Sequence, residues 1–264
     1  MYNFEYTKAK SVADAAKAAS ADAEAKLLAG GMTLIPTLKQ RLAKPTAVID
    51  LNGIADLVGI KRDGNNLVIG AMTRHADVAR SADVKAVIPA LAHLAELIGD
   101  PAVRNRGTIG GSIANHDPAA DYPAGVLGLN ATVTTNKRQI KADDFFTGMF
   151  STALEDGEIV TAVSFPKPDK AGYMKFKNPA SRYAIVGVFV AKTGNDVRVA
   201  VTGAGPGVFR SKELETALAK SFLPTAVEGI KIAADGLNSD IHASAEYRAH
   251  LITVMAKRAV VACG

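Results

Sequence analysis

The chain has 264 residues, of which 48% are apolar and 22% charged, a composition typical of globular proteins with ample length for a core. No apolar run approaches the roughly 20 residues of a membrane span and no hydrophobic leader opens the chain, so we expect a cytoplasmic protein without a transmembrane segment. The single cysteine, Cys263, excludes a disulfide framework or a cysteine-ligated cluster within one chain, and the net charge of +5 is too scattered to indicate nucleic-acid binding.

Residues 1 to about 55 predict a small α/β unit. Ser11 is a plausible cap for an alanine-rich helix, and Thr33 is expected to cap a second helix with Pro36 in its first turn. In chain order the pattern predicts a helix over 11–23, a strand over 26–30, a helix over 33–42 and a strand over 47–51. The last three elements form a β-loop-α-β unit.

Residues 56–166 predict a second unit, which begins with a hairpin. Asp63 and Gly64 supply turn chemistry between two apolar arms. Thr73 is expected to cap one helix and Pro89 to open another. In chain order the pattern predicts a hairpin over 58–70, helices over 76–84, 89–99 and 122–129, strands over 131–136 and 138–141, a short helix over 143–146 and a strand over 158–166.

Pro166 and Pro168 indicate a linker into a third unit. Strands are predicted over 173–178, 184–192 and 196–205, and helices follow them. Strands followed by helices predict an antiparallel sheet with helices on one face. In the last helix we assign one stripe mainly to the core: Tyr247, Leu251, Val254, Met255 and Arg258.

The segment RNRGTIGGSIANHDPAADYPA, residues 104–124, concentrates small and polar side chains and has few bulky apolar ones. Gly110 and Gly111 lack a Cβ, so backbone N–H groups can turn inward and approach an anion closely. Neighbouring hydroxyl and amide side chains add donors without bulk. The segment is therefore predicted to cradle a phosphate.

A second glycine pair, Gly30 and Gly31 in KLLAGGMTLIPTLKQRL, stands between a short apolar run and a predicted helix, where amide donors converge. Two such loops suggest a dinucleotide pyrophosphate held from both sides. Ordinary glycine turns are the alternative for either loop alone. Neither G-x-G-x-x-G after a strand nor G-x-x-x-x-G-K-S/T occurs, which disfavours a Rossmann or P-loop site.

The segments AGGMT, residues 29–33, and RNRGTIGGSIANHDPAADYPA resemble the flavoprotein (medium) subunit of the molybdenum hydroxylases, the FAD-binding chain or domain of the carbon monoxide dehydrogenase and xanthine dehydrogenase family. Weaker matches downstream extend the resemblance over nearly the whole chain. It implies an α+β fold, in which a two-part FAD-binding domain of the VAO/PCMH type, with two α/β subdomains, precedes a C-terminal domain with a three-stranded antiparallel sheet and helices. The implied domains are 1–166, with subdomains of about 1–55 and 56–166, and 167–264.

The resemblance also implies which residues meet the cofactor. Asp121 would accept hydrogen bonds from cofactor hydroxyls, and Lys177 would lie near the flavin ring. Ile159 or Val160 would supply an apolar backbone contact to the ring. A helix cap, a solvated strand lysine and plain core positions are the respective alternatives. The residues implied for the two loops are Ala29, Gly30, Gly31, Met32 and Thr33, and Thr108, Gly111, Ser112 and Asn115.

Met32 follows the first glycine pair, where some FAD enzymes with a comparable cradle carry a covalently attached histidine, so we expect noncovalent FAD. His116 lies inside the long motif. Electron transfer through a flavin needs no side-chain base at this loop, so we expect a solvent-facing histidine and assign no catalytic residue. No spacing typical of a metal site is present.

The resemblance implies an FAD-carrying electron-transfer subunit of a heteromeric molybdenum hydroxylase. Electrons would pass from 2Fe–2S clusters of a small subunit, through this FAD, to NAD, a quinone or oxygen. A large subunit would carry the molybdenum–pterin, in a dimer of heterotrimers, and the substrate would not be chosen by this chain. The alternatives are a stand-alone FAD-dependent oxidase or dehydrogenase, and a noncatalytic module that binds a phosphate ligand.

Overall fold

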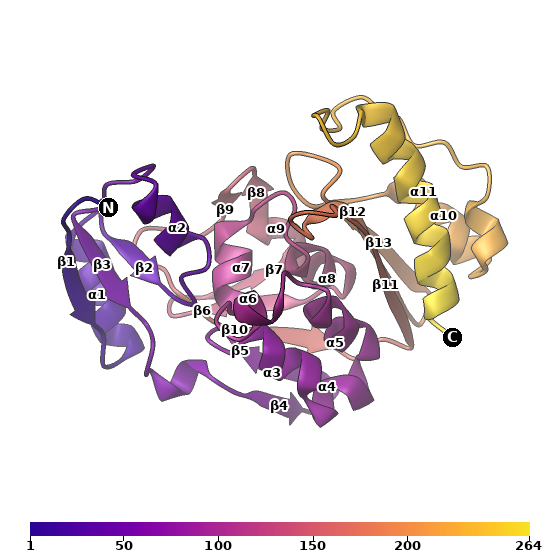
Figure 1. Cartoon of the computed structure of the whole chain (residues 1–264). Helices are drawn as coiled ribbons and strands as arrows, with labels where there is room; N and C mark the ends of the chain where they lie inside the picture. Colours follow the sequence, from indigo (N-terminus) through magenta and orange to yellow (C-terminus); the bar gives the residue numbers. More distant parts are fainter.

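Three larger sheets with their own helices follow one another along the chain in the computed structural model, which describes residues 1–264, and a two-stranded sheet is the fourth (Figure 1). The N-terminus lies on the lobe built around the first sheet, and the C-terminus lies on the opposite side of the molecule, at the end of the last helix. None of the helices combines the length and apolar character needed to cross a membrane.

The N-terminal lobe is built around a parallel sheet with the strand order β1-β3-β2. The Ser11 side chain accepts a hydrogen bond from the Asp14 N–H at 3.1 Å, which confirms the predicted cap of α1. Strand β1 has no counterpart in the sequence-based prediction, because all four of its side chains are exposed and no buried face marks it. The elements are β1 (Glu5–Lys8), α1 (Val12–Ala21), β2 (Lys26–Leu28), α2 (Leu34–Lys39), β3 (Ala47–Asp50) and the 3-10 turn η1 (Ala55–Leu57).

Thr33 stands immediately before α2, but the predicted cap is wrong. Its backbone is already helical, and its side chain makes no capping hydrogen bond. A capping side chain normally requires extended backbone at that position. The hydroxyl of Thr33 is therefore not used to begin the helix.

The central lobe contains an antiparallel sheet with the strand order β4-β5-β10-β6-β7. Its helices cover one face and contribute half of the 30 buried residues of a large apolar core. The elements are β4 (Ile60–Asp63), β5 (Asn66–Gly70), α3 (His75–Arg80), α4 (Ala82–Val87), α5 (Pro89–Glu96), α6 (Pro101–Arg104), α7 (Ile109–Asn115), α8 (Tyr122–Gly128), β6 (Thr132–Thr135), β7 (Gln139–Lys141), α9 (Ala142–Phe145), β8 (Phe146–Gly148), β9 (Ser151–Thr152) and β10 (Val160–Pro166).

The helix predicted over 76–84 is two helices, because Ser81 leaves the helical conformation and caps α4, its hydroxyl accepting from the Val84 N–H at 3.3 Å. Thr73 does not cap α3. Its hydroxyl instead bonds both backbone groups of Gly59, at 3.0 and 3.1 Å. The tertiary contact with the preceding hairpin therefore replaces the local cap.

The C-terminal lobe is a four-stranded antiparallel sheet in the order β11-β12-β13-β14, so a short fourth strand adds to the three predicted. Helix α11 packs against β11 and β12, and α10 packs against β13 (Figure 1). Helices α5 and α8 pack against the other face, which buries β12 along nearly its whole length. The elements are β11 (Lys170–Lys177), β12 (Ala184–Thr193), β13 (Asp196–Thr202), β14 (Phe209–Arg210), α10 (Lys212–Lys220), η2 (Pro224–Val227) and α11 (Ala245–Ala262).

The stripe predicted to be the buried face of the last helix is only partly so. Leu251 and Met255 are buried, whereas Tyr247 and Arg258 are exposed. The buried face instead includes Arg248, whose guanidinium donates to the carbonyls of Ile185 and Gly203. These bonds tie α11 to the sheet.

Candidate functional site

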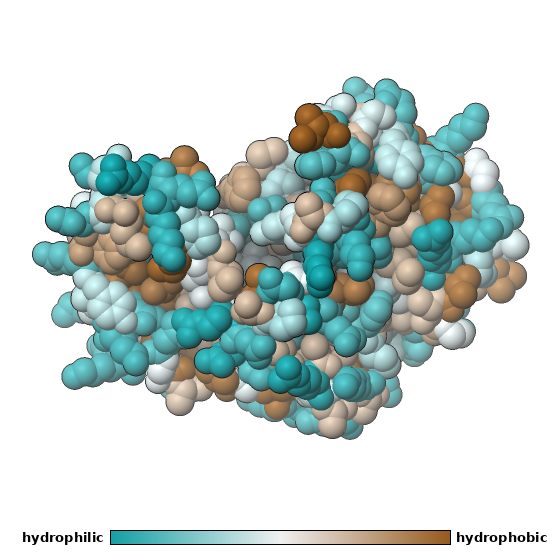
Figure 2. Space-filling view, in the orientation of Figure 1, coloured by the Kyte–Doolittle hydropathy of each residue, from teal (hydrophilic) through white to brown (hydrophobic).

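A cavity of about 620 Å³ lies where the three lobes meet. In the space-filling view, the surface is hollowed between the N-terminal lobe and the rest of the molecule (Figure 2). The cavity brings together residues far apart in the sequence. Of the residues implied for the cofactor site, those that line it are Ala29, Gly30, Gly31, Met32, Thr33, Thr108, Gly111, Ser112, Asn115, Asp121, Ile159 and Val160.

The loop 29–33 presents unpaired backbone donors to this cavity. None of the N–H groups of residues 30–33 donates a hydrogen bond within the chain. Gly31 has a φ of +75°, and a Cβ on Gly30 would lie 2.2 Å from the Arg106 carbonyl oxygen. Glycine is therefore required at both positions, by conformation and by close approach. Consecutive free amides of this kind form an anion-binding concavity.

The motif over residues 104–124 contributes to the cavity in another way than the predicted cradle of backbone N–H groups. Its glycine pair forms the first turn of α7, and the amides of that turn are already paired. Gly110 donates to the Ala71 carbonyl at 2.8 Å, and Gly111 donates to the Thr108 hydroxyl at 3.2 Å. The motif therefore supplies few unpaired backbone N–H groups to the cavity. It brings small side chains close to the first loop, since a Cβ on Gly111 would lie 3.3 Å from that of Ala29.

A buried ion pair forms part of the cavity wall. Asp121 and Lys175 both line the cavity, and their side chains are 4% and 1% exposed. The Lys175 ammonium donates to one Asp121 oxygen at 2.9 Å, and the Tyr173 hydroxyl donates to the other. Burial raises the pKa of the Asp121 carboxyl, and the two donors oppose that shift. Asp121 stands before α8 but makes no capping hydrogen bond.

Lys177 lies outside the cavity, and its side chain is exposed. Tyr173, Lys175 and Lys177 would share one face of a regular strand. The pairing of β11 with β12 shifts its register between Phe176 and Lys177, and this irregularity interrupts the alternation. Lys175 lines the cavity, whereas Lys177, which the resemblance implies near the flavin ring, does not. Side chains two residues apart share a face of a strand, so the buried Tyr173 is the sequence signal that could have identified Lys175.

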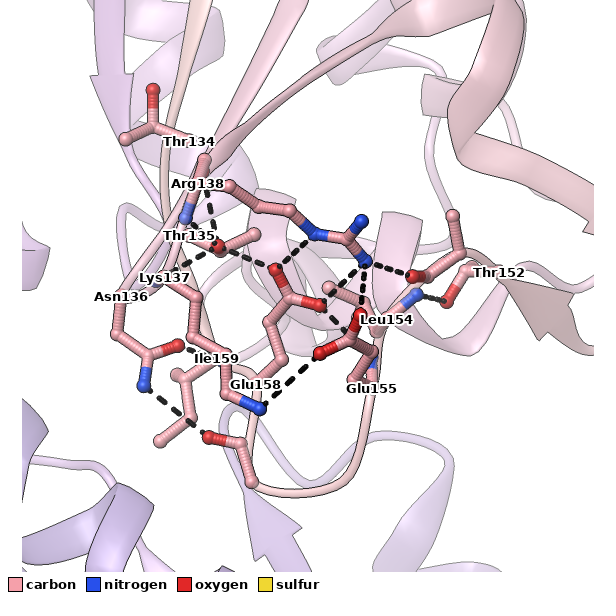
Figure 3. A network of polar contacts seen from close by, with 12 residues as sticks. Thr134, Thr135, Asn136, Lys137, Arg138, Thr152, Leu154, Glu155, Glu158 and Ile159 are labelled. Atoms are coloured by element: carbon pink, nitrogen blue, oxygen red, sulfur yellow. Dashed lines mark hydrogen bonds and ion pairs between the residues drawn. The ribbon is translucent and has the colours of Figure 1, made fainter.

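Glu158 anchors the turn that leads to Ile159 (Figure 3). Its side chain is fully buried and accepts hydrogen bonds from Arg138 at 3.0 Å and Thr135 at 2.7 Å. The Arg138 hydrogen bond is the main cause that lowers the pKa of Glu158 to about 2. Asn136 pairs with both backbone groups of Ile159, at 2.8 and 3.0 Å. Asn136 thereby holds the backbone of Ile159, which lines the cavity, in place.

His75 lines the cavity and is absent from the residues predicted from sequence. Its side chain is buried, and Nδ1 has no hydrogen-bond partner in the chain. Burial, reinforced by the Arg104 charge, lowers the pKa of His75 to about 4. The imidazole packs against the Tyr122 ring, with 5.3 Å between ring centroids. No sequence pattern marks this histidine as different from the others.

The expectation that His116 faces solvent is wrong, since the residue is only 1% exposed. Its Nδ1 lies 2.9 Å from the Ser151 carbonyl oxygen, and its Nε2 accepts from the Val208 N–H at 3.4 Å. The two contacts fit the tautomer with the proton on Nδ1. His116 does not line the cavity. It connects the motif to β8–β9 and to the C-terminal lobe.

Large apolar side chains stand exposed at the cavity: Met32, Phe150 and Tyr183 are 37%, 56% and 49% exposed. Phe150 and Tyr183 were not predicted as site residues. Tyr183 belongs to the segment FKNPASRY, whose lysine alone was singled out, and Phe150 has no sequence signal beyond its aromatic type. Both are suited to contact a flat ring.

The arrangement fits FAD. The unpaired amides of residues 30–33 suit a pyrophosphate, the hydroxyl and amide side chains of Ser112 and Asn115 suit polar chain atoms, and the apolar wall suits a planar ring system. No group of three or more His, Cys, Asp or Glu side chains is placed to hold a metal ion. The cavity can therefore bind a phosphate-bearing aromatic cofactor with the chain's own backbone and side chains.

Two family models match the chain. The FAD binding domain in molybdopterin dehydrogenase matches residues 2–168, and the CO dehydrogenase flavoprotein C-terminal domain matches residues 171–262. The chain is 38% identical over 274 residues to the carbon monoxide dehydrogenase medium chain of Hydrogenophaga pseudoflava, covering 97% of this chain and 96% of that one. It is 36% identical over 273 residues to the nicotine 6-hydroxylase medium subunit of Paenarthrobacter nicotinovorans, covering 98% and 96%.

The structure is also similar to a solved structure of the carbon monoxide dehydrogenase from Hydrogenophaga pseudoflava that lacks the Mo-pyranopterin moiety of its cofactor. The TM-score is 0.88 at 36% identity, and 99% of this chain and 97% of that chain are covered. The family models and this likeness confirm the resemblance and the fold class expected from the sequence.

Proposed function

Because the chain belongs to the medium, FAD-binding subunits of the molybdenum hydroxylase family, we propose that its FAD relays electrons from 2Fe–2S clusters of a small subunit to an external acceptor. The chain is an oxidoreductase subunit, and FAD is its cofactor. When bound, FAD supplies a centre that takes up two electrons and passes them on. The acceptor is NAD, a quinone or oxygen.

The observation that carries this proposal is the row of unpaired amides at residues 30–33. These N–H groups would hold the pyrophosphate, with Gly30 and Gly31 allowing its close approach. Ala29 and Met32 would contribute backbone contacts, and the free hydroxyl of Thr33 a further donor. The cofactor would be held noncovalently, because Met32 offers no nucleophile for attachment.

The opposite wall would orient the rest of the cofactor. Thr108, Gly111, Ser112 and Asn115 would approach the pyrophosphate and the ribityl chain from α7. Asp121 would accept hydrogen bonds from cofactor hydroxyls with the lone pairs that Lys175 and Tyr173 leave free. Ile159 or Val160 would supply an apolar backbone contact to the flavin ring.

The proposed complex contains a small iron–sulfur subunit and a large molybdenum subunit, arranged as a dimer of heterotrimers. Both relatives named above are medium chains or subunits, of a carbon monoxide dehydrogenase and of a nicotine 6-hydroxylase. Different substrates are thus compatible with one medium-subunit fold, and we propose that the large subunit selects the substrate. The domain bounds of 1–166 and 167–264, and a cytoplasmic location, remain predictions.

The test is an absorption spectrum of the natively purified chain before and after acid precipitation, with copurifying partners identified by mass. A flavin spectrum that moves to the supernatant, with a large subunit and a cysteine-rich small subunit alongside, is the expected result. Flavin and turnover in the isolated chain would favour a stand-alone oxidase or dehydrogenase. A colourless chain that added FAD does not stabilise would favour a noncatalytic phosphate-binding module.

A further inference from the structure

The turn between β8 and β9 carries a side chain that its backbone conformation does not favour. Gly148 and Ser151 pair across the hairpin, so Met149 and Phe150 are the two central residues of the turn. Phe150 has a φ of +50°. Turn positions with positive φ are normally occupied by glycine or asparagine, because a Cβ there crowds the backbone. A large side chain at such a position points to a requirement outside the turn.

Contacts with another element hold the turn in this conformation. The Phe150 N–H donates to the His116 carbonyl at 3.2 Å, and His116 is 1% exposed. Nδ1 of the same histidine lies 2.9 Å from the Ser151 carbonyl oxygen, and the hydroxyls of Ser151 and Thr147 bond each other at 2.8 Å. A buried residue at the end of α7 thus fixes two consecutive residues of the hairpin. The backbone of Phe150 is therefore held where it is left-handed.

The Phe150 side chain is not buried by the chain itself. The residue is 56% exposed and lines the cavity. Met149, its neighbour in the turn, is 54% exposed and does not line the cavity. An exposed ring contributes little apolar burial to the stability of the chain alone. The ring is, however, open to contact by a ligand in the cavity.

The proposed cofactor brings two flat rings into this cavity. FAD carries a flavin and an adenine, one on each side of its pyrophosphate, for which residues 30–33 offer unpaired amides. Among the residues that line the cavity, the exposed Phe and Tyr rings are those of Phe150 and Tyr183. Two aromatic rings in contact attract each other beyond the effect of the area that they bury. A ring of FAD therefore matches the exposed surface of Phe150.

We propose that the Phe150 ring packs against one of the two aromatic rings of bound FAD, and that this contact is the reason for a large side chain at a left-handed turn position. The inference deepens the proposed function and rests on it, since it requires FAD in the cavity. It assigns a cofactor contact to the β8–β9 turn, which lies outside both glycine-containing segments. Phe150 thereby disfavours the fold of the FAD-free chain and favours the bound cofactor.

The strain is tested on the FAD-free chain by comparing alanine with glycine at both turn positions. Phe150→Ala and Phe150→Gly both remove the ring, so the difference between them reports the backbone alone. Glycine ordinarily destabilises a chain relative to alanine, but at a left-handed position it removes the crowding of the Cβ. We expect a folding equilibrium constant about threefold larger for Phe150→Gly than for Phe150→Ala. The order should reverse for Met149→Gly and Met149→Ala, because Met149 is not left-handed. Chemical denaturation measures both pairs.

The contact with the cofactor is tested by isothermal titration calorimetry of the FAD-free chain with FAD. Phe150→Ala and Phe150→Gly are each expected to raise the dissociation constant of FAD about tenfold, because a ring contact is lost. Phe150→Tyr keeps the ring and should keep the wild-type affinity, as should the control Met149→Ala. FMN and ADP each carry a phosphate and one of the two rings. The probe that binds more weakly to Phe150→Ala than to the wild type identifies the ring that Phe150 contacts.

The outcomes separate this inference from the proposed function. If the wild type does not bind FAD, the proposed function fails, whatever the stability of the turn variants. If the wild type binds FAD and Phe150→Ala and Phe150→Gly bind it equally well, the contact is overturned. If Phe150→Gly is less stable than Phe150→Ala, the turn is not strained and the proposed reason for its side chain is overturned. If one of these two variants does not fold, the affinity of the other still decides whether the contact exists.

Discussion

The Nδ1 atom of His116 lies 2.9 Å from the Ser151 carbonyl oxygen and so joins the end of α7 to the β8–β9 hairpin. The carbonyl of His116 accepts from the Phe150 N–H at 3.2 Å, which reinforces the junction. The imidazole ring also packs against Phe146, with 4.6 Å between ring centroids. Phe150 lines the cavity, so this histidine holds part of the cavity wall without contacting a ligand itself.

His116→Ala is expected to lower the free energy of unfolding by about 1 to 3 kcal/mol, because two buried hydrogen bonds and the ring packing are lost. Chemical denaturation of the FAD-free chain measures this difference. The matched control is His242→Ala, since His242 is exposed. Equal stability of the His116 variant and the wild type would contradict the structural role.

Gly111→Val is expected to weaken FAD binding at least tenfold, or about 1.4 kcal/mol. Any Cβ at Gly111 lies 3.0 Å from the Thr108 hydroxyl oxygen and fills the gap toward Ala29, where the two cavity walls approach. Titration of the FAD-free chain with FAD, followed by fluorescence, measures the affinity.

Gly148→Val is the control for that substitution, because a Cβ at Gly148 meets only the Ser151 side chain at 3.8 Å. Both variants should unfold at similar denaturant concentrations without FAD. Wild-type affinity in the Gly111 variant would show that the approach of α7 to the first loop does not shape the cofactor site.

The low pKa of the buried His75 side chain predicts that the folded chain loses stability in mild acid. Its pKa is about 4 in the folded chain and 6.5 in the unfolded one, so the unfolded state binds more protons between these values. The contribution of the neutral His75 to the free energy of unfolding is complete above pH 6.5 and declines as the pH falls toward 4. Between pH 6.5 and 5 the decline is on the order of 2 kcal/mol.

Denaturation curves of the wild type and His75→Gln across that range measure the contribution of His75, which the variant should lack. His93→Gln is the control, because His93 is exposed. If the wild type and the His75 variant lose stability in parallel, the imidazole is not held neutral by burial.

The low pKa of Glu158 predicts a second loss of stability at a more acidic pH. Its folded pKa is about 2 and its ordinary value is 4.5, so its contribution is present above pH 4.5 and is lost as the pH falls toward 2. Glu158→Gln should remove about 1 to 2 kcal/mol of the acid dependence in this window. Glu155→Gln, at a carboxylate that is 60% exposed, should change it little. Unfolding curves of the wild type and the two variants at pH 3 and pH 6 measure this acid dependence.

The sequence by itself determined the family, the cofactor and most of the elements. The glycine pair at 30–31 and the motif over 104–124 are local signals, because a missing Cβ has the same consequence in any fold. Alternation and capping likewise predicted the strands and the cap at Ser11, since they depend on neighbours a few residues away. In the structure, twelve of the thirteen residues predicted for the site line one cavity, and their contact with a cofactor stays a prediction.

Only the tertiary structure decided which of these groups are free to act. The amides of Gly110 and Gly111 are paired because Ala71 and Thr108 reach them, while those of residues 30–33 have no partner. His116 is buried because a hairpin and a loop from another lobe close over it. These contacts join residues distant in sequence, and no local pattern encodes them.

Lys175 and Lys177 of β11 also show what the sequence determined and what the tertiary structure decided. Two-residue alternation puts Lys175 and Lys177 on the same face of β11, but in the structure Lys177 lies beyond a shift in the register with β12 and its side chain is exposed, whereas Lys175 lines the cavity. The irregularity depends on how β11 and β12 meet across the hairpin loop, and pairing between strands is a property of the folded sheet. The sequence therefore determined that a lysine is available beside the cavity, and the sheet decided which one.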